Sequence, residues 1–286
     1  MSSTKRKKAI VTGASHGIGR GVARVLANKG YDVVISYNSN KAGAESLKAE
    51  IEANGESKCY IHEAHLEKDG VASYFICQAI EDLGGLDLLV NNAGRCFYEP
   101  LFDMKEETID LLLTLDFRTY IITMREAARY MKSNHIHGSL INITSSRAER
   151  AYPGDAIYGA MKAALNRAVQ SIALDCAPYG IRVNNVAPGA TRTMDKAELA
   201  AKGAIPSTES PDWWDELSKR IPLGREGQPE DIGNVVAALA SDEFGYCTGI
   251  TVRVDGGLIL PGMPEDLTLR NDHGWGFMGF MEPKSD

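Results

Sequence analysis

Tyr158 and Lys162 are separated by 162 − 158 = 4 residues, so on a helix they lie on one face, one turn apart. A tyrosine has a reference pKa of about 10 and is a poor base at neutral pH unless a cation stabilises its phenolate. Lys162 can be that cation. Ser145 lies 158 − 145 = 13 residues before Tyr158 and adds a hydroxyl group. The spacing indicates a proton-transfer site, although Tyr and Lys four residues apart also occur in helices that carry no chemistry.

A glycine-rich segment at residues 12–19, Thr-Gly-Ala-Ser-His-Gly-Ile-Gly, follows a short apolar run and leads into a stretch with helical periodicity. Glycines let the backbone turn tightly and let a pyrophosphate approach the N–H groups at a helix N-terminus, where the helix dipole favours negative charge. A glycine-rich turn by itself can be a plain tight loop. Its place between a strand and a helix predicts a dinucleotide-binding turn.

The end of the second strand indicates which dinucleotide is bound. An acidic residue there accepts hydrogen bonds from the ribose of NAD, but this chain has Tyr37. Ser15, His16, Asn38 and Ser39 are placed to donate hydrogen bonds to a 2′-phosphate. We therefore expect NADP(H), with NAD(H) as the alternative, because no arginine supplies a charge-assisted contact at position 16 or 38.

Strand-like and helix-like segments alternate along the chain. Apolar runs typical of strands buried on both faces occur at residues 8–12, 32–36, 57–62, 86–91, 140–144, 182–187 and 250–254. Helix-period stretches separate them. This pattern predicts an α/β, doubly wound Rossmann fold: a seven-stranded parallel sheet with helices on both faces and ligands beyond the carboxyl ends of the strands.

The length of 286 residues fits a single domain over residues 1–262. Residues 191–220 are polar, contain two prolines and the pair Trp213 and Trp214, and are predicted to form a mobile substrate lid. Residues 263–286 form a C-terminal extension that contains Trp275 and is either an interface arm or a frayed tail.

Composition restricts the partners. The 38 Asp and Glu residues outnumber the 31 Lys and Arg residues, so the net charge is −7, which repels nucleic acid and anionic membranes. We find no apolar run of about 18 residues and no export segment. The five cysteines follow no paired spacing and are interpreted as reduced thiols in a cytoplasmic protein. His135 and His137 have no third ligand at a recognisable spacing, so no metal site is expected.

Five motifs occur together and in order: residues 12–19, Asn-Asn-Ala-Gly at 91–94, Ser145, Tyr158-x-x-x-Lys162, and Pro-Gly at 188–189. In this combination the chain resembles the short-chain dehydrogenase/reductase family, from about residue 7 to residue 258. The resemblance implies one Rossmann dehydrogenase domain that moves a hydride between a nicotinamide and a secondary alcohol or carbonyl.

The resemblance also implies roles for individual residues. Tyr158 would be the general acid/base, Lys162 would lower its pKa and hold the nicotinamide ribose, and Ser145 would bind the substrate oxygen. Thr193 would contact the carboxamide. The residues expected to bind the cofactor are Gly13, Ser15, His16, Gly17, Ile18, Gly19, Tyr37, Asn38, Ser39, His65, Leu66, Asn92, Ala93, Gly94, Tyr158, Lys162, Pro188, Gly189, Thr191 and Thr193.

Two positions depart from the family pattern. Asp116 stands where the family usually has asparagine as a fourth catalytic residue. An aspartate there can preserve a water held by the backbone, but a carboxylate near Lys162 would shift the local charge balance. His65 replaces an aspartate beside the adenine, and it either stacks on that base or is a solvated surface histidine.

Several scaffold stretches are most similar to bacterial glucose 1-dehydrogenases, which favours a sugar or polyol substrate. A 3-oxoacyl-acyl-carrier-protein reductase and a hydroxysteroid dehydrogenase are the alternatives. The loop at residues 147–157 contains Glu149, Arg150, Tyr152 and Asp155, polar groups suited to hydroxyl-rich ligands. A dinucleotide-binding regulator on the same fold is the non-enzymatic alternative, and by resemblance the protein is expected to be a homotetramer.

Overall fold

Seven parallel strands form one sheet in the computed structural model, which describes residues 6–194, 196–201 and 213–260. The strand order is β3-β2-β1-β4-β5-β6-β7. All seven predicted strands are present, and their ends differ from the predicted ones by two residues at most. The strands are β1 (Lys7–Val11), β2 (Tyr31–Tyr37), β3 (Cys59–Glu63), β4 (Leu88–Asn91), β5 (Ser139–Ile143), β6 (Arg182–Pro188) and β7 (Thr251–Val254).

The sheet order reverses between β1 and β4. β1 pairs with β2 on one side and with β4 on the other, so the segments that follow β1 and β4 diverge at the carboxyl ends of these strands. An open parallel sheet binds its ligand at such a reversal. The glycine-rich turn follows β1, and residues 92–95 follow β4, so the topology brings the two segments to the same crevice.

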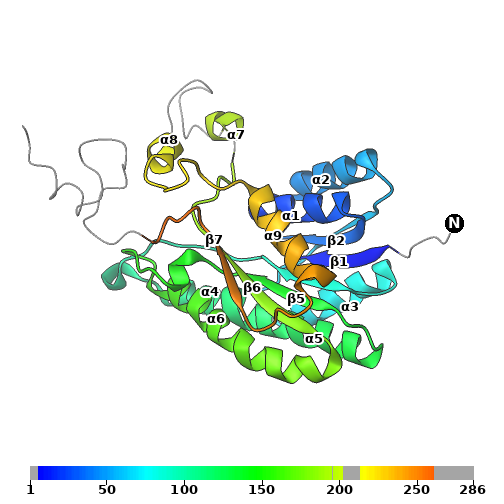
Figure 1. The fold of residues 1–286 in the computed structure, drawn as a ribbon. Coiled ribbons are helices and arrows are strands. Elements are labelled where there is room, and N and C mark those ends of the chain that lie inside the picture. The colour runs from blue at the N-terminus through cyan, green and yellow to red at the C-terminus, as the bar shows by residue number, and fades with distance from the viewer. Residues whose placement is uncertain (1–5, 195, 202–212, 261–286) are drawn as a thin grey trace, which may run out of the picture.

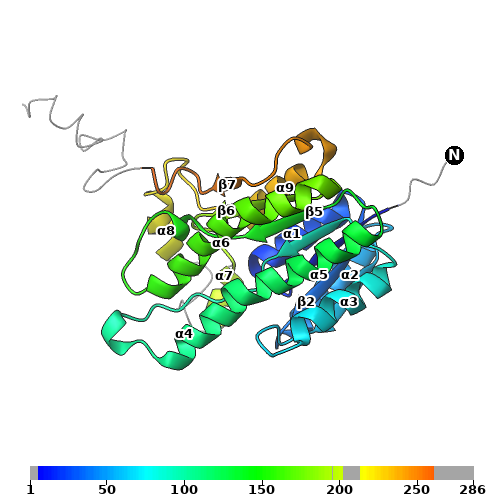
Figure 2. The ribbon, with the colours of Figure 1, turned by 90° about the horizontal axis from the view of Figure 1, so that it is seen from below.

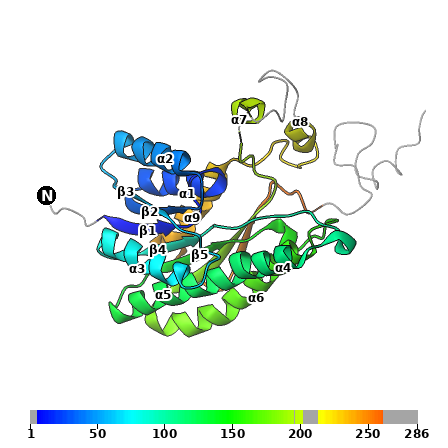
Figure 3. The ribbon, with the colours of Figure 1, turned by 180° about the vertical axis from the view of Figure 1, so that it is seen from behind.

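Helices cover both faces of the sheet, as predicted (Figures 1 and 3). On one face, α1, α2 and α9 pack over side chains such as Val11 and Ile35. On the other face, α3, α5 and α6 pack over Ile10 and Leu89, and Figure 2 shows α5 and α6 running across the sheet. The helices are α1 (Gly17–Asn28), α2 (Lys41–Asn54), α3 (Val71–Leu83), α5 (Thr119–Ser133), α6 (Ala156–Cys176) and α9 (Pro229–Ala240).

A short π-helical turn, η2 (Thr114–Arg118), lies between α4 (Glu106–Leu113) and α5. A π-helical turn inserts an extra residue into a helix and reorients the side chains around it, and such turns are frequent at functional sites. Asp116 lies in the middle of this turn and is fully buried. The turn therefore directs a carboxylate into the interior of the protein.

The segment predicted to be a lid contains two short helices, α7 (Lys196–Ala201) and α8 (Trp213–Ser218), which lie away from the sheet in Figure 1. Trp214 is buried in a small cluster with Met194 and Leu217, so its ring stabilises this segment and is not available to a ligand. Residues 261–286 lie outside the described residues. The domain limits and the role of the C-terminal extension therefore stay predictions.

Within the described residues, no helix has both the length and the apolar character needed to cross a membrane. All five cysteines are free thiols in this structure.

Candidate active site

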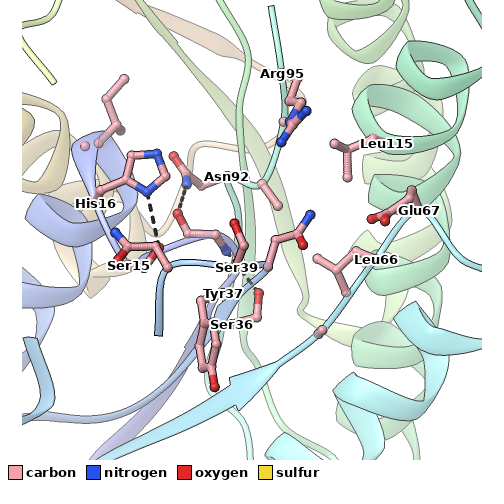
Figure 4. A pocket seen from close by; sticks show the side chains of 18 of the residues that line it. Ser15, His16, Ser36, Tyr37, Ser39, Leu66, Glu67, Asn92, Arg95 and Leu115 are labelled. Carbon is pink, nitrogen blue, oxygen red and sulfur yellow. Dashed lines mark hydrogen bonds between the residues drawn. The ribbon is translucent and has the colours of Figure 1, made fainter. Parts of the chain in front are cut away.

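A pocket of about 370 Å³ opens beyond the carboxyl ends of β1, β2 and β4 (Figure 4). In the close-up, His16 and Ser15 lie on one side of the pocket, and Leu66, Glu67 and Leu115 lie on the other. Thirteen of the predicted cofactor residues line it: Gly13, Ser15, His16, Gly17, Ile18, Tyr37, Asn38, Ser39, Leu66, Asn92, Ala93, Gly94 and Thr193.

The glycine-rich turn has the backbone geometry that an anion requires. Gly13 and Gly17 have φ angles of +65° and +57°, which side chains other than hydrogen disfavour. A Cβ atom on Gly13 would lie 2.8 Å from the Cα atom of Ala93. Helix α1 begins at Gly17, with no side-chain cap from His16 and no acidic residue in its first turn. Its first N–H groups and its dipole therefore suit a pyrophosphate.

Hydrogen bonds fasten the loop after β4 to this turn. The Thr12 hydroxyl accepts from the backbone N–H groups of Asn92 at 2.9 Å and Ala93 at 3.0 Å. The side-chain amide of Asn92 donates to the carbonyl oxygens of Thr12 at 3.0 Å and Gly13 at 2.9 Å. These hydrogen bonds therefore fix the glycine-rich turn and the loop after β4, which both line the pocket, before a ligand binds.

The end of β2 presents neutral polar groups to the pocket. Tyr37 is 6% exposed, and the Ser36 hydroxyl accepts a hydrogen bond from the Gly13 N–H at 3.0 Å. Asn38, Ser39 and Asn40 continue this wall. Glu67 is the one carboxylate among the described lining residues, and it lies beside Leu66 on the far side of the pocket from His16 (Figure 4).

A buried cluster of ionisable groups surrounds Lys162. Tyr158 and Lys162 lie on the first two turns of α6, and the Lys162 ammonium is 5.5 Å from the centre of the Tyr158 ring. The ammonium forms an ion pair with Asp116 Oδ1 at 3.0 Å. It also donates to the hydroxyl of Tyr120 at 3.3 Å and to the carbonyl oxygen of Ile143 at 3.4 Å. Lys162 is 3% exposed and Asp116 is 0% exposed.

The surroundings shift the pKa values of both residues of the pair. Burial acts to lower the pKa of Lys162, but Tyr120, Asp116 and Tyr158 outweigh it and raise that pKa, so Lys162 is an ammonium at neutral pH. Burial is the largest influence on Tyr158 and raises its pKa; Lys162 lowers it, and Asp116 raises it again. The lysine acts in the expected direction, but the net pKa of Tyr158 lies above its ordinary value.

Gly94 connects the cluster to the pocket. It lines the pocket, and a Cβ atom at this position would collide with Asp116 Oδ1 and lie 3.5 Å from Lys162 Nζ. Ser145 follows β5 and is buried, with its hydroxyl accepting from the Arg147 N–H at 3.1 Å. A hydrogen bond from Ser145 lowers the pKa of Tyr158, so these two hydroxyl groups face each other.

Several predicted residues lie elsewhere. His65 is not among the pocket-lining residues; it lies between Glu63 at 3.4 Å and Glu67 at 3.6 Å. The other predicted cofactor residues that do not line the pocket are Gly19, Tyr158, Lys162, Pro188, Gly189 and Thr191. Gly189 packs on Asp255, and Thr191 forms a bridge with Gly227.

Other pocket residues were missed from the sequence. They are Ser36, Asn40, Ala64, Glu67, Arg95 and Leu115. Tyr120, the second phenol beside Lys162, was missed as well, although its spacing of 120 − 116 = 4 residues from Asp116 could have indicated it. The described residues contain no group of three His, Cys, Asp or Glu side chains suited to a metal ion.

The loop predicted to contact substrate is internally paired. Arg147 forms an ion pair with Asp155 at 2.7 Å and stacks on the rings of Tyr98 at 4.9 Å and Tyr152 at 4.3 Å. Glu149 pairs with Arg253 at 2.8 Å. A ligand that uses these carboxylates must therefore compete with the arginines.

Comparison with known proteins adds to this geometry. Residues 13–259 match the family model described as enoyl-(acyl carrier protein) reductase. The chain is 36% identical to L-rhamnose 1-dehydrogenase (NAD(P)(+)) of Azotobacter vinelandii, over 89% of this chain and 97% of that protein. It is 35% identical to the 3-oxoacyl-[acyl-carrier-protein] reductase FabG of Staphylococcus epidermidis, over 89% of this chain and 99% of that protein.

Solved structures share the fold. A blue fluorescent protein from a metagenomic library, in complex with NADPH, superposes with a TM-score of 0.77 at 32% identity. The match covers 88% of this chain and 98% of that one.

Proposed function

Because the chain belongs to the short-chain dehydrogenase/reductase family of oxidoreductases, we propose that it interconverts a secondary alcohol and its carbonyl with NADP(H). A sugar or polyol is the proposed substrate. The observation that carries this proposal is the pairing of Tyr158 with an ammonium group directly behind Gly94, at the edge of a pocket whose glycine turn suits a dinucleotide.

A bound nicotinamide dinucleotide would supply or accept the hydride. The N–H groups at the start of α1 would hold its pyrophosphate, and Asn92, Ala93 and Gly94 would line its path toward Lys162. The helix start, which has no side-chain cap, and the close packing of Gly13 on Ala93 fit such a group.

The side chains of the cluster would handle the proton. In carbonyl reduction, Tyr158 gives its proton to the substrate oxygen; in alcohol oxidation, the phenolate takes the hydroxyl proton. Ser145 orients the substrate oxygen through its hydroxyl. Lys162 stays protonated and stabilises the phenolate when it forms, because its own pKa is raised.

The preference for NADP(H) is supported by the wall at the end of β2. Tyr37 brings no negative charge to the place where a carboxylate would repel a 2′-phosphate, and Asn38 and Ser39 offer hydrogen-bond donors. The relative from A. vinelandii is named for both cofactors, and the metagenomic neighbour is in complex with NADPH.

A sugar or polyol is favoured by the L-rhamnose 1-dehydrogenase relative and by the polar loop that contains Arg147 and Asp155. The second candidate is a 3-oxoacyl thioester, which the FabG relative favours. A hydroxysteroid is the third candidate class of substrate.

A substrate panel tests the proposal. Sugars, polyols, hydroxysteroids and 3-oxoacyl thioesters are each followed at the nicotinamide absorbance with NADP(H) and with NAD(H). We expect the highest kcat/KM for a sugar or polyol with the phosphorylated cofactor. Turnover confined to thioesters would transfer the assignment to the second candidate, and no turnover with any compound would contradict the proposal.

We also propose a homotetramer. Leu174 on α6 is 76% exposed, and Tyr179 just after this helix is partly exposed, so the outer end of α6 offers apolar surface to another copy of the chain. Light scattering coupled to size exclusion measures the assembled mass, and a monomer would contradict this expectation.

A further inference from the structure

We propose that Asp116 is a positioning residue that keeps Tyr158 protonated at neutral pH and thereby sets the pH above which alcohol oxidation becomes fast. The inference rests on the proposed function for its consequence, but its physical basis is a charge arrangement within the chain itself. Asp116 acts through Lys162 and the Gly94–Arg95 backbone, not by contact with substrate.

The Asp116 carboxylate is held from two sides. Its Oδ1 lies 3.0 Å from Lys162 Nζ, and its Oδ2 accepts a hydrogen bond from the backbone N–H of Arg95 at 3.1 Å. The side chain is fully buried, and the π-helical turn η2 fixes its direction. The carboxylate therefore cannot turn away from Lys162 without losing both contacts.

This contact changes what Lys162 offers to Tyr158. A lone buried ammonium would strongly stabilise a neighbouring phenolate, because charges interact strongly where water is excluded. With a carboxylate 3.0 Å away, the pair carries no net charge, and its field at Tyr158 is that of a dipole. The phenol of Tyr158 is half-buried, and its loss of contact with water then decides the balance and favours the uncharged, protonated form.

The other groups around Tyr158 leave this balance unchanged. Within the described part of the chain, the groups that face Tyr158 are Lys162 of α6, Asp116 of η2, Tyr120 of α5, Ser145 after β5, and Cys96 and Tyr98 after β4. Burial raises the pKa of Tyr120 to about 12 and raises the pKa values of Cys96 and Tyr98. These three groups are therefore neutral at pH 7, and only the Asp116–Lys162 pair is charged.

A protonated Tyr158 is ready for reduction. A bound reduced nicotinamide dinucleotide would supply a hydride to the carbonyl carbon; the C=O electron pair would move to the oxygen, and that oxygen would take the Tyr158 proton. The products are the alcohol, the oxidised dinucleotide and the phenolate, which regains a proton from water. Oxidation requires the phenolate at the outset, so it is slow until the pH approaches the raised pKa of Tyr158.

Replacement of the carboxylate by its neutral isostere tests the inference. Asp116→Asn keeps an acceptor for the Arg95 N–H and removes the negative charge. We expect the midpoint of the pH profile of kcat/KM to fall by about one pH unit, both for oxidation and for reduction. A charge this close to an ionisable group shifts its pKa by about that amount. At pH 7 the kcat/KM for oxidation should therefore rise severalfold.

A second readout needs no substrate or cofactor. Ultraviolet titration of the unliganded protein, with the spectrum of the Tyr158→Phe protein subtracted, reports ionisation of Tyr158. The Asp116→Asn protein, with Asp116→Asn/Tyr158→Phe as its own reference, should titrate about one pH unit lower. Asp116→Ser also removes the negative charge and should shift the midpoint in the same way. It replaces Asp116→Asn in the titration if the Asn variant folds poorly.

Tyr120→Phe is the matched control, since it removes a neutral partner of Lys162 at 3.3 Å and should leave the midpoint near the wild-type pH. An unchanged midpoint in both neutral Asp116 variants would overturn the inference, even if both variants turn over slowly. If the titration shifts while no substrate is turned over, the inference about Tyr158 stands and the proposed function fails.

Discussion

The side-chain amide of Asn92 donates a hydrogen bond to the carbonyl oxygen of Gly13 at 2.9 Å. A second bond from the same amide reaches Thr12 at 3.0 Å, so one side chain satisfies two carbonyl groups of a turn that forms no regular structure. Two strands that are far apart in sequence but adjacent in the sheet are thus locked together at their carboxyl ends. The shape of the pocket depends on these two hydrogen bonds.

Asn92→Ala should loosen the turn and weaken dinucleotide binding. Two partly buried carbonyl groups lose their partner, which costs about 1 to 3 kcal/mol of unfolding free energy, and the cofactor Kd should rise at least severalfold. Urea unfolding and fluorescence titration with NADPH measure the two effects. Asn134→Ala is the control, because Asn134 caps the exposed end of α5 by a bond to Tyr130 and should leave the Kd unchanged. Equal Kd values for wild type and Asn92→Ala would contradict the assignment.

Gly17 and Gly30 stand at opposite ends of α1 and form a matched pair. Both have positive φ, +57° and +88°, so each alanine variant should lose about 1 to 2 kcal/mol of stability through backbone strain. A Cβ atom on Gly17 would lie 3.3 Å from Thr193 at the pocket, whereas nothing lies within 4 Å at Gly30. We expect only Gly17→Ala to raise the Kd for NADPH, measured by fluorescence titration at a temperature where both proteins are folded.

Tyr37→Asp should reverse the cofactor preference. The new carboxylate at the end of β2 would accept hydrogen bonds from an unmodified ribose and repel a 2′-phosphate. The ratio of the Kd for NADPH to the Kd for NADH should rise at least tenfold, while Tyr37→Phe keeps the wild-type ratio. If the ratio is the same in Tyr37→Asp as in wild type, the 2′-phosphate of the cofactor does not lie beside residue 37.

The strands were predictable because each is a short apolar run that ends at a polar or glycine-containing turn. Residues 57 and 58 were assigned to β3, but the strand begins at Cys59; Ser57 instead donates its hydroxyl to the carbonyl of Ala27. Hydrophobicity marks the buried centre of a strand, whereas its first residue depends on hydrogen bonds to distant segments. The hydrophobic pattern therefore predicts the centre of a strand more accurately than its ends.

The site was predictable where spacing along one element determines proximity, as for Tyr158 and Lys162. It was not predictable where a contact crosses elements. The sequence placed Asp116 near Lys162 only by resemblance, and neither the 3.0 Å ion pair nor the contribution of Tyr120 follows from spacing within α6. Arg95 was missed because it follows a loop motif whose direction depends on the hydrogen bond to Asp116.

Tyr158→Phe removes the proposed proton carrier and keeps the ring. Turnover should fall by several orders of magnitude, whereas the cofactor Kd should change little, because the packing beside Lys162 is retained. Steady-state assays and fluorescence titration of the same preparation separate these effects. Turnover equal to wild type would remove Tyr158 from the mechanism.

Cys59 should make the stability of the fold depend on alkaline pH. Burial, reinforced by Glu52, raises the pKa of this thiol from 9.0 to about 12, and the side chain is 1% exposed in β3. A raised folded-state pKa means that the stabilisation is complete below the unfolded pKa and is lost as the pH rises from about 9 toward 12. The loss amounts to about 1.4 kcal/mol per pH unit.

Cys59→Val removes this ionisation and suits a buried strand. Between pH 9 and pH 10.5, its free energy of unfolding should therefore decline less steeply than that of wild type, by up to about 1.4 kcal/mol per pH unit. The remaining decline comes from other groups whose pKa values are raised in the folded chain, among them Tyr31 and Tyr120, for which burial raises the pKa to about 12. Urea unfolding at each pH gives the slopes, and Cys77→Ala, at an exposed position on α3, should keep the wild-type slope. Identical slopes for Cys59→Val and wild type would mean that the Cys59 thiol ionises as easily in the folded chain as in the unfolded one.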